Sequence, residues 1–302
     1  MQIVVGTATE QNRQPEPPER KPNEDYVAYA RSESGVIAVV MDGIPVLRTS
    51  DGSYPRENGA VASQIAANMM CELLAPKSPN LDDLRQAFGQ ANQRIKRENN
   101  RLQMYLKTPP HWLATVGCAL WADSRSEQSF FGYIDDPLAF VVSPDFRVTL
   151  LTEDQHAPSE GHFWAKHQDE MNSQDPAGNS HFREHQDRFV RNCVDAHCWC
   201  GERFRGWGAL TGKETVMDFV TVSTVATPPG TRIVLASDAI EAIGRGQARE
   251  RIADDYRTAL LDTLGIKPQA AAVELIRLIR RGEEEKRCKS DDTAIAVIDF
   301  KT

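Results

Sequence analysis

The stretch Val36-Ile-Ala-Val-Val-Met41-Asp42-Gly43 is an almost uninterrupted apolar run that ends in a carboxylate and a glycine. Continuous apolar runs of this length are typical of β-strands buried on both faces. Three other segments also place acidic residues next to a β-prone run, and they come from both ends of the chain. These segments are Arg20-Lys-Pro-Asn-Glu24-Asp25, Arg232–Asp238 and Ser290–Thr293. The shared pattern predicts that several strands converge on one charged site.

Size and composition describe a globular protein. The chain has 302 residues and a net charge of −8, with 40% hydrophobic and 26% charged residues. This length suits one large domain or two small ones. The acidic balance disfavours nucleic-acid partners, which require a basic footprint. The first residues lack the basic and apolar regions of a leader, and no apolar run reaches the roughly 20 residues of a membrane span. We therefore expect a cytoplasmic protein with no membrane partner.

Periodicity predicts strands first, then a helix pair, more strands, a second helix pair and a closing strand. This order favours an α+β protein in which antiparallel sheets are covered by helices. The four runs between residues 113 and 152 are predicted to form an antiparallel meander. The predicted strands are Ile3–Thr9, Tyr26–Ala30, Val36–Met41, Leu113–Ala122, Ser129–Ile134, Leu138–Ser143, Arg147–Thr152, Val216–Val225, Arg232–Ala236 and Thr293–Phe300. The predicted helices are Glu57–Leu74, Leu81–Leu106, Ala248–Leu264 and Gln269–Arg281.

The acidic segments have the donor chemistry of a hard divalent cation site. Mg²⁺ and Mn²⁺ prefer oxygen ligands, and a pair of such ions needs a bridging carboxylate. Asp42 is the predicted bridge because it ends the most apolar strand, and Gly43 leaves its carbonyl open to a metal. The other predicted ligands are Asp238 and Asp291 at one ion, and Glu24 and Asp25 at the other.

Arg20 completes the predicted constellation, because its planar guanidinium matches two phosphate oxygens. Two ions in such a site would supply hydroxide near neutral pH and neutralise phosphoryl charge. Each feature alone also has an ordinary structural interpretation: an Asp-Gly turn, a helix N-cap at Ser237-Asp238, or a charge pair in a loop. The joint order of the segments and their strand contexts favour the functional interpretation.

The same order resembles that of the PPM-type (type 2C) metal-dependent serine/threonine protein phosphatases. The likeness spans nearly the whole chain and rests on five features. They are Arg20 four residues before Glu24-Asp25, the strand ending Asp42-Gly43, the Gly230–Asp238 strand, Asp291-Asp292 before the last strand, and Phe131–Asp154 with the stretch Leu151–His156. The resemblance implies a single domain over residues 1–302, folded as a four-layer α-β-β-α sandwich with the binuclear site at one edge between the sheets.

The resemblance also implies an activity. We expect a phosphatase that hydrolyses phosphoserine or phosphothreonine in proteins, opposing a serine/threonine kinase. A water or hydroxide bridging two Mn²⁺ or Mg²⁺ ions would attack phosphorus, with Arg20 binding the phosphate. Asp136 matches an acid that some bacterial members use for a third metal.

Two loops depart from the family pattern. Asp42-Gly-Ile-Pro45 lacks the usual glycines, and the hairpin at Asp135–Leu138 lacks the usual arginine. These departures motivate an alternative, a pseudophosphatase that keeps the fold and acts as a regulatory binding module. A two-metal phosphoesterase with a small-molecule substrate is a further alternative.

Residues 153–213 form a polar insertion rich in His, Cys and Trp, which we interpret as a flap beside the site. The cysteines and histidines of residues 156–200 are ligand types that zinc prefers. The spacing Cys193-x₄-Cys198-x-Cys200, however, has no matching second pair of ligands. We therefore favour a polar loop anchored by tryptophans over a zinc site. No phosphate-cradling loop surrounds any cysteine. Cys71 and Cys118 lie in apolar segments and are predicted to be buried thiols.

Overall fold

The structure is a computed structural model of the 302-residue chain. It describes residues 1–11, 23–44, 58–103, 112–155, 206–243, 252–286 and 292–302, together with 158, 161, 198–199 and 202–203. Arg20, Asp291 and most of the predicted insertion at 153–213 lie outside the described residues.

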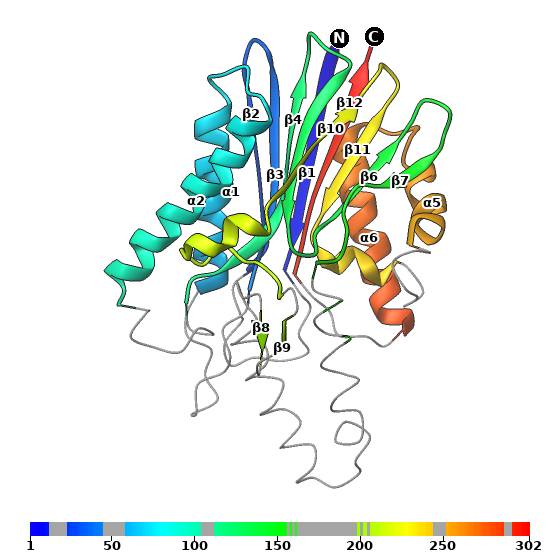
Figure 1. The fold of residues 1–302 in the computed structure, drawn as a ribbon. Helices are drawn as coiled ribbons and strands as arrows, with labels where there is room; N and C mark the ends of the chain where they lie inside the picture. The colour runs from blue at the N-terminus through cyan, green and yellow to red at the C-terminus, as the bar shows by residue number, and fades with distance from the viewer. Residues whose placement is uncertain are drawn as a thin grey trace, which may run out of the picture.

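Two five-stranded antiparallel sheets form the centre of the fold (Figure 1). One sheet has the order β10-β5-β4-β3-β2 and the other the order β1-β12-β11-β6-β7. The first sheet consists of β2 (Tyr26–Arg31), β3 (Gly35–Gly43), β4 (Thr115–Asp123), β5 (Gln128–Ile134) and β10 (Thr221–Ala226). The second consists of β1 (Gln2–Glu10), β6 (Leu138–Val142), β7 (Val148–Leu150), β11 (Arg232–Ala236) and β12 (Thr293–Lys301).

Helices cover the outer face of each sheet, which makes four layers (Figure 1). Helices α1 (Asn58–Leu74) and α2 (Leu81–Arg101) pack on the β3-containing sheet. Helices α5 (Ile252–Asp262) and α6 (Pro268–Lys286) pack on the other. The shorter elements are the 3₁₀ helices η3 (Glu214–Asp218) and η4 (Asp238–Ala242), and the strands β8 (Cys198–Trp199) and β9 (Glu202–Arg203). The predicted α-β-β-α sandwich is confirmed.

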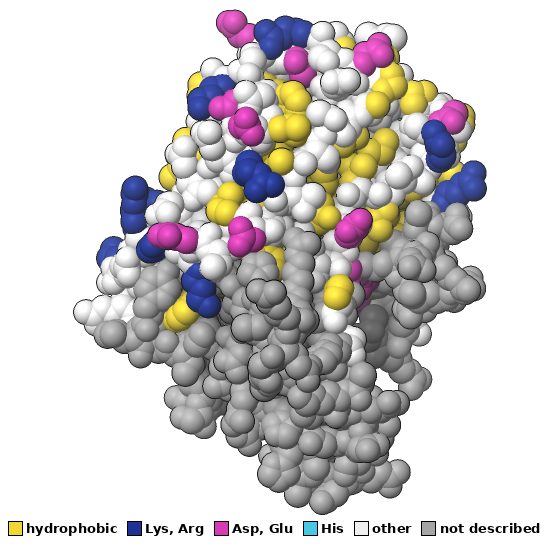
Figure 2. Space-filling view, in the orientation of Figure 1, with side chains coloured by type: hydrophobic (Ala, Val, Ile, Leu, Met, Phe, Trp, Pro, Cys, Tyr) yellow, Lys and Arg dark blue, Asp and Glu magenta, His cyan; other side chains and the backbone are white. Residues whose placement is uncertain are grey.

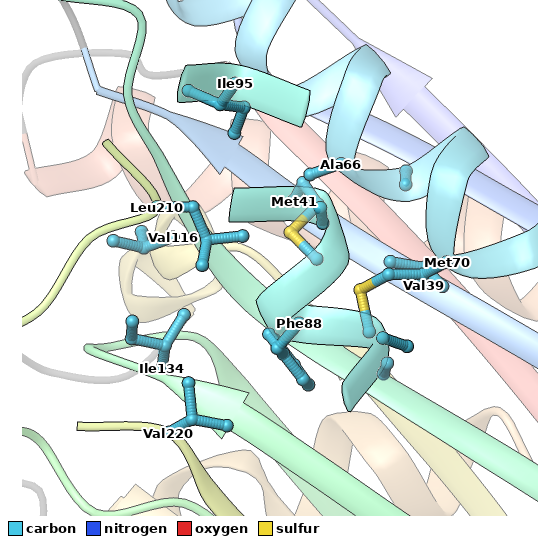
Figure 3. Packing of buried hydrophobic residues seen from close by; sticks show 14 of the residues in the cluster. Val39, Met41, Ala66, Met70, Phe88, Ile95, Val116, Ile134, Leu210 and Val220 are labelled. Carbon is cyan, nitrogen blue, oxygen red and sulfur yellow. The ribbon is translucent and has the colours of Figure 1, made fainter. Parts of the chain in front are cut away.

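Three hydrophobic cores separate the four layers. The central core lies between the sheets and includes Val40 and Ile298. The outer cores join each sheet to its helix pair. Figure 3 shows the first of these, where Val39 and Met41 of β3 lie near Met70 of α1. Strand β3 therefore contributes to two cores, which explains why its sequence is apolar at successive positions.

Two sequence predictions are wrong in detail. The four runs between residues 113 and 152 do not form one meander, because β5 pairs with β4 and β10 while β6 pairs with β11 and β7. The turn between β5 and β6 instead carries the chain from one sheet to the other. The predicted strand Val216–Val225 is a 3₁₀ helix followed by the shorter β10.

Acidic and basic side chains are interspersed over the described part of the face seen in Figure 2, with hydrophobic side chains between them. That visible surface carries no single-sign patch of the kind that binds nucleic acid. Among the described helices, none has the length and apolar character needed to cross a bilayer.

Gly6 of β1 allows helix α6 to approach the edge of its sheet. A Cβ atom at Gly6 would lie 2.0 Å from the backbone nitrogen of Gln269 and 2.2 Å from the carbonyl carbon of Pro268. The side chain of Gln269 also accepts a hydrogen bond from the Thr7 N–H and donates one to the Thr7 carbonyl. The first turn of α6 is thus fixed on the outer strand of the sheet.

We predict that Gly6→Ala lowers the free energy of unfolding by about 1–3 kcal/mol, because the clash is with backbone and cannot be relieved by a side-chain rotation. Gly265→Ala is the matched control, since a Cβ there meets no atom within 4 Å. Urea unfolding followed by circular dichroism measures both. Equal stability of the two variants would contradict the close approach of α6 to β1.

Candidate metal centre

The antiparallel register brings Glu24, Asp25, Asp42 and Gly43 together at one end of the first sheet. Tyr26 pairs with Met41 in the β2–β3 ladder. Continued by two residues, this register places Asp25 opposite Asp42 and Glu24 opposite Gly43. Glu24 and Asp25 are both 5% exposed, so two carboxylate residues are buried beside the end of the most apolar strand.

The second sheet contributes Asp238 and Asp136 at the same end, the lower end of the sheets in Figure 1. Leu138 of β6 pairs with Ala236 of β11. Asp136 precedes this pair by two residues and Asp238 follows it by two, so both aspartates lie at this end of the ladder. Both residues are half-buried. Asp238 begins η4 with Ser237 as its N-cap, but the Ser237 hydroxyl accepts from the Ala294 N–H instead of capping η4.

One buried hydrogen bond joins the two halves of this cluster. The backbone N–H of Glu24, just before β2, donates to Oδ2 of Asp292, just before β12, at 2.8 Å. Asp292 is 2% exposed. The sequence pointed to Asp291 as a ligand but assigned no role to Asp292. Nothing in the sequence alone distinguishes this anchor from its neighbour, because the bond spans 268 residues.

Side chains from other elements hold the backbone carbonyls of two proposed ligands. The Ser63 hydroxyl of α1 donates to the Glu24 carbonyl at 2.5 Å. The Thr115 hydroxyl of β4 donates to the Asp42 carbonyl at 2.6 Å. The Ser63 and Thr115 side chains are both buried, so the backbone of the proposed ligands is held rigidly from two sides.

Gly43 and Gly59 allow the chain segments to meet. A Cβ at Gly43 would lie 2.6 Å from the Glu24 carbonyl oxygen, and one at Gly59 would lie 2.9 Å from Glu24 Oε1. The Glu24 carboxylate therefore lies against the first turn of α1, where the positive end of the helix dipole stabilises an anion. Packing therefore requires a residue without a side chain at Gly43. This requirement is separate from the predicted role of the Gly43 carbonyl as a metal ligand.

Buried amides of α2 position the chain around the start of β4. Asn99 accepts from the Leu113 N–H and donates to the carbonyls of Leu113 and Thr211. Asn92 accepts from the Gly212 N–H and donates to the Lys213 carbonyl. The helical pattern predicted α2, but it gave no signal that these two polar residues face inward.

The donor chemistry of the cluster fits hard divalent cations, because it consists of carboxylates and backbone carbonyls. Within the part of the chain that the structure describes, no group of three or more His, Cys, Asp and Glu side chains is placed so as to hold a metal ion. Arg20 and Asp291 lie outside that part. The proposed ligand set therefore stays a prediction, for which the shared location of Glu24, Asp42, Asp238 and Asp136 is the structural support.

Burial disfavours thiolate chemistry at Cys71 and Cys118. Burial raises the pKa of the Cys71 thiol to about 12, with a contribution from the Glu72 charge. Burial also raises the pKa of Cys118 far above its ordinary range. The prediction that both are buried thiols is confirmed.

Comparison with known proteins identifies the family. The profile of the family described as protein phosphatase 2C matches residues 19–268, and this chain belongs to that family. No curated protein matches the sequence significantly.

Solved structures of phosphatases share the fold. The serine/threonine phosphatase PstP/Ppp of Mycobacterium tuberculosis is 19% identical with a TM-score of 0.62, and 99% of each chain is covered. The catalytic domain of PstP in complex with two manganese ions is 18% identical with a TM-score of 0.60, again over 99% of each chain. The PPM Ser-Thr phosphatase MsPP from Mycobacterium smegmatis is 20% identical with a TM-score of 0.55, over 98% of each chain.

We predict that Asp292→Ala lowers the free energy of unfolding by about 1–3 kcal/mol, because it leaves the buried Glu24 N–H without its acceptor. Asp292→Asn keeps an acceptor oxygen in place and should retain most of the stability. Urea unfolding in the presence of a chelator measures both without any metal. Equal loss in the two variants would show that the charge of Asp292 matters and its hydrogen bond does not.

We also predict that Cys71 and Cys118 resist alkylation in the folded protein. A raised pKa leaves almost no thiolate at pH 8, and the thiolate is the reactive form. Mass spectrometry of peptides after iodoacetamide treatment should find both cysteines unmodified in native protein and modified in guanidinium chloride. Modification of Cys118 at the same rate in both states would contradict its burial.

Proposed function

We propose that this protein is a metal-dependent phosphatase that hydrolyses phosphoserine or phosphothreonine in proteins. The observation that carries the proposal is the gathering of acidic strand ends from both sheets at one edge of a protein phosphatase 2C fold. In the proposal, Asp42 bridges two Mn²⁺ or Mg²⁺ ions. Asp238 and Asp291 serve one ion, and Glu24, Asp25 and the Gly43 carbonyl serve the other.

When bound, the ions would lower the pKa of a water and neutralise charge on a phosphoryl oxygen. The chain's own contribution is positional. The Thr115 hydroxyl holds the backbone of Asp42, while Ser63 and Asp292 hold the backbone of Glu24. Arg20 is proposed to bind the phosphate with its planar fork, which would orient phosphorus toward the attacking water.

The proposed partner is a phosphorylated protein whose modification is made by a serine/threonine kinase. Glu24 and Asp25 are buried, while Asp42 and Asp238 are half-buried, and this graded exposure suits a phosphate that protrudes from a peptide on an extended side chain. The pairing of the first strand with the last supports the proposed single-domain organisation of residues 1–302.

A regulatory binding module is the second candidate. The observation that favours it is the departure of the Asp42–Pro45 and Asp135–Leu138 loops from the family pattern. Isothermal titration with Mn²⁺ discriminates the two candidates: binding of two ions at sub-millimolar concentration supports the phosphatase, and failure to bind supports the module.

We predict that Asp42→Asn and Asp238→Asn each reduce Mn²⁺-dependent phosphate release from a phosphothreonine peptide by about 100-fold or more, because each removes a charged ligand. Glu33→Gln is the matched control. It removes one exposed charge from the β2–β3 turn, at the other end of β3 from Asp42, and should keep full activity. Retention of activity in both aspartate variants would refute the proposed mechanism.

A further inference from the structure

Gln155 connects the turn between β5 and β6 to the start of β10 through one side-chain amide. Its Oε1 accepts a hydrogen bond from the backbone N–H of Asp135 at 3.1 Å. Its Nε2 donates to the carbonyl of Phe219 at 2.9 Å and to the hydroxyl of Thr221 at 3.3 Å. Only a group that accepts on one side and donates on the other can make this set of contacts, and a primary amide is such a group.

The backbone that Gln155 holds is strained. Asp135 has a φ of 68°, in the left-handed region that few residues other than glycine adopt. It is 3% exposed. The Asp135 carbonyl also accepts a hydrogen bond, at the longer distance of 3.5 Å, from the backbone N–H of Gln155. A strained conformation persists only where its surroundings determine it, and here Gln155 contacts both polar groups of the peptide backbone.

The residue that follows this strained turn is Asp136. The β6–β11 ladder ends at the pair Leu138–Ala236, so Asp136, two residues before Leu138, and Asp238, two residues after Ala236 and a proposed metal ligand, both lie at this end of the second sheet. Because the turn carries the chain between the sheets, its conformation decides whether the Asp136 carboxylate reaches Asp238. Fixing Asp135 therefore fixes the position of Asp136.

The geometry points to Gln155 as a positioning residue that holds the Asp136 carboxylate beside Asp238 for a weakly bound additional Mn²⁺ ion. This inference rests on the proposed function for its metal, and on the Gln155 contacts for its mechanism. Gln155 does not itself touch metal or substrate in this assignment. It acts through the Asp135 backbone, and it ties that turn to Phe219, just before β10, and to Thr221 of β10 in the first sheet.

Hydrogen exchange in the metal-free protein tests the mechanical part. Gln155→Met keeps side-chain length but removes the acceptor and both donors. We expect faster exchange in peptides that cover the Asp135 turn and Phe219–Thr221. Gln128→Met is the matched control, since Gln128 is exposed at the opposite end of β5 and should change neither peptide. Unchanged protection of the Asp135 amide in Gln155→Met would overturn the inference.

A double-mutant cycle tests the functional part. We expect Gln155→Met and Asp136→Asn each to raise, by about tenfold, the Mn²⁺ concentration that gives half-maximal activity on a phosphothreonine peptide. The double variant should resemble Asp136→Asn alone, because Gln155 acts through Asp136. If the effects of the two substitutions instead multiply in the double variant, Gln155 has a general structural role and the assignment is overturned.

Gln155→Glu separates the two sets of contacts. It keeps the acceptor for the Asp135 N–H and loses the donor to Phe219, so the turn should stay protected while Phe219–Thr221 exchange faster. If the wild-type protein shows no Mn²⁺-dependent activity, the proposed function fails. The exchange measurements alone then confirm or overturn the link between Gln155 and the turn.

Discussion

The arrangement of the acidic edge depends on the buried hydrogen bond from the Glu24 N–H to the Asp292 carboxylate. It links the segment before β2 in one sheet to the segment before β12 in the other, at the end where both sheets present acidic residues. The central apolar core also joins the two sheets, but hydrophobic packing is non-directional. A charge-assisted hydrogen bond adds the directional constraint that hydrophobic packing lacks.

The three apolar cores supply the rigidity that this edge requires. Strand β3 packs against the other sheet on one face and against α1 and α2 on its other face, so Asp42 and Gly43 extend from a fixed strand. Collecting carboxylates at the end of such a strand is electrostatically costly in the absence of cations. The first turn of α1, beside the Glu24 carboxylate, offsets part of that cost, while Ser63 and Thr115 hold the backbone carbonyls of Glu24 and Asp42 in place. The arrangement suits a fold whose charged edge is completed by divalent cations.

The opposite end of the second sheet uses charge differently. Arg232 donates to both carboxylate oxygens of Asp299, and its guanidinium also reaches the Ile266 carbonyl in the connection between α5 and α6. This ion pair has a structural role, because Arg232 holds the connection between α5 and α6 against the sheet. The contrast between the two ends separates structural charge from charge available for function. Solved phosphatase structures with about one-fifth sequence identity share the fold.

The sequence by itself determined the layered α+β architecture and the set of acidic strand ends, because apolar periodicity and local residue order report directly on strand burial. It did not determine that β5 and β6 lie in different sheets, since a turn signal between two strands does not say whether they pair. It also gave no role to Asp292, Asn99 or Gln155, whose partners are distant in the chain. Only the tertiary structure decided those roles, because a hydrogen bond between remote segments leaves no periodicity in the sequence and exists only once the sheets have set the distance between its atoms.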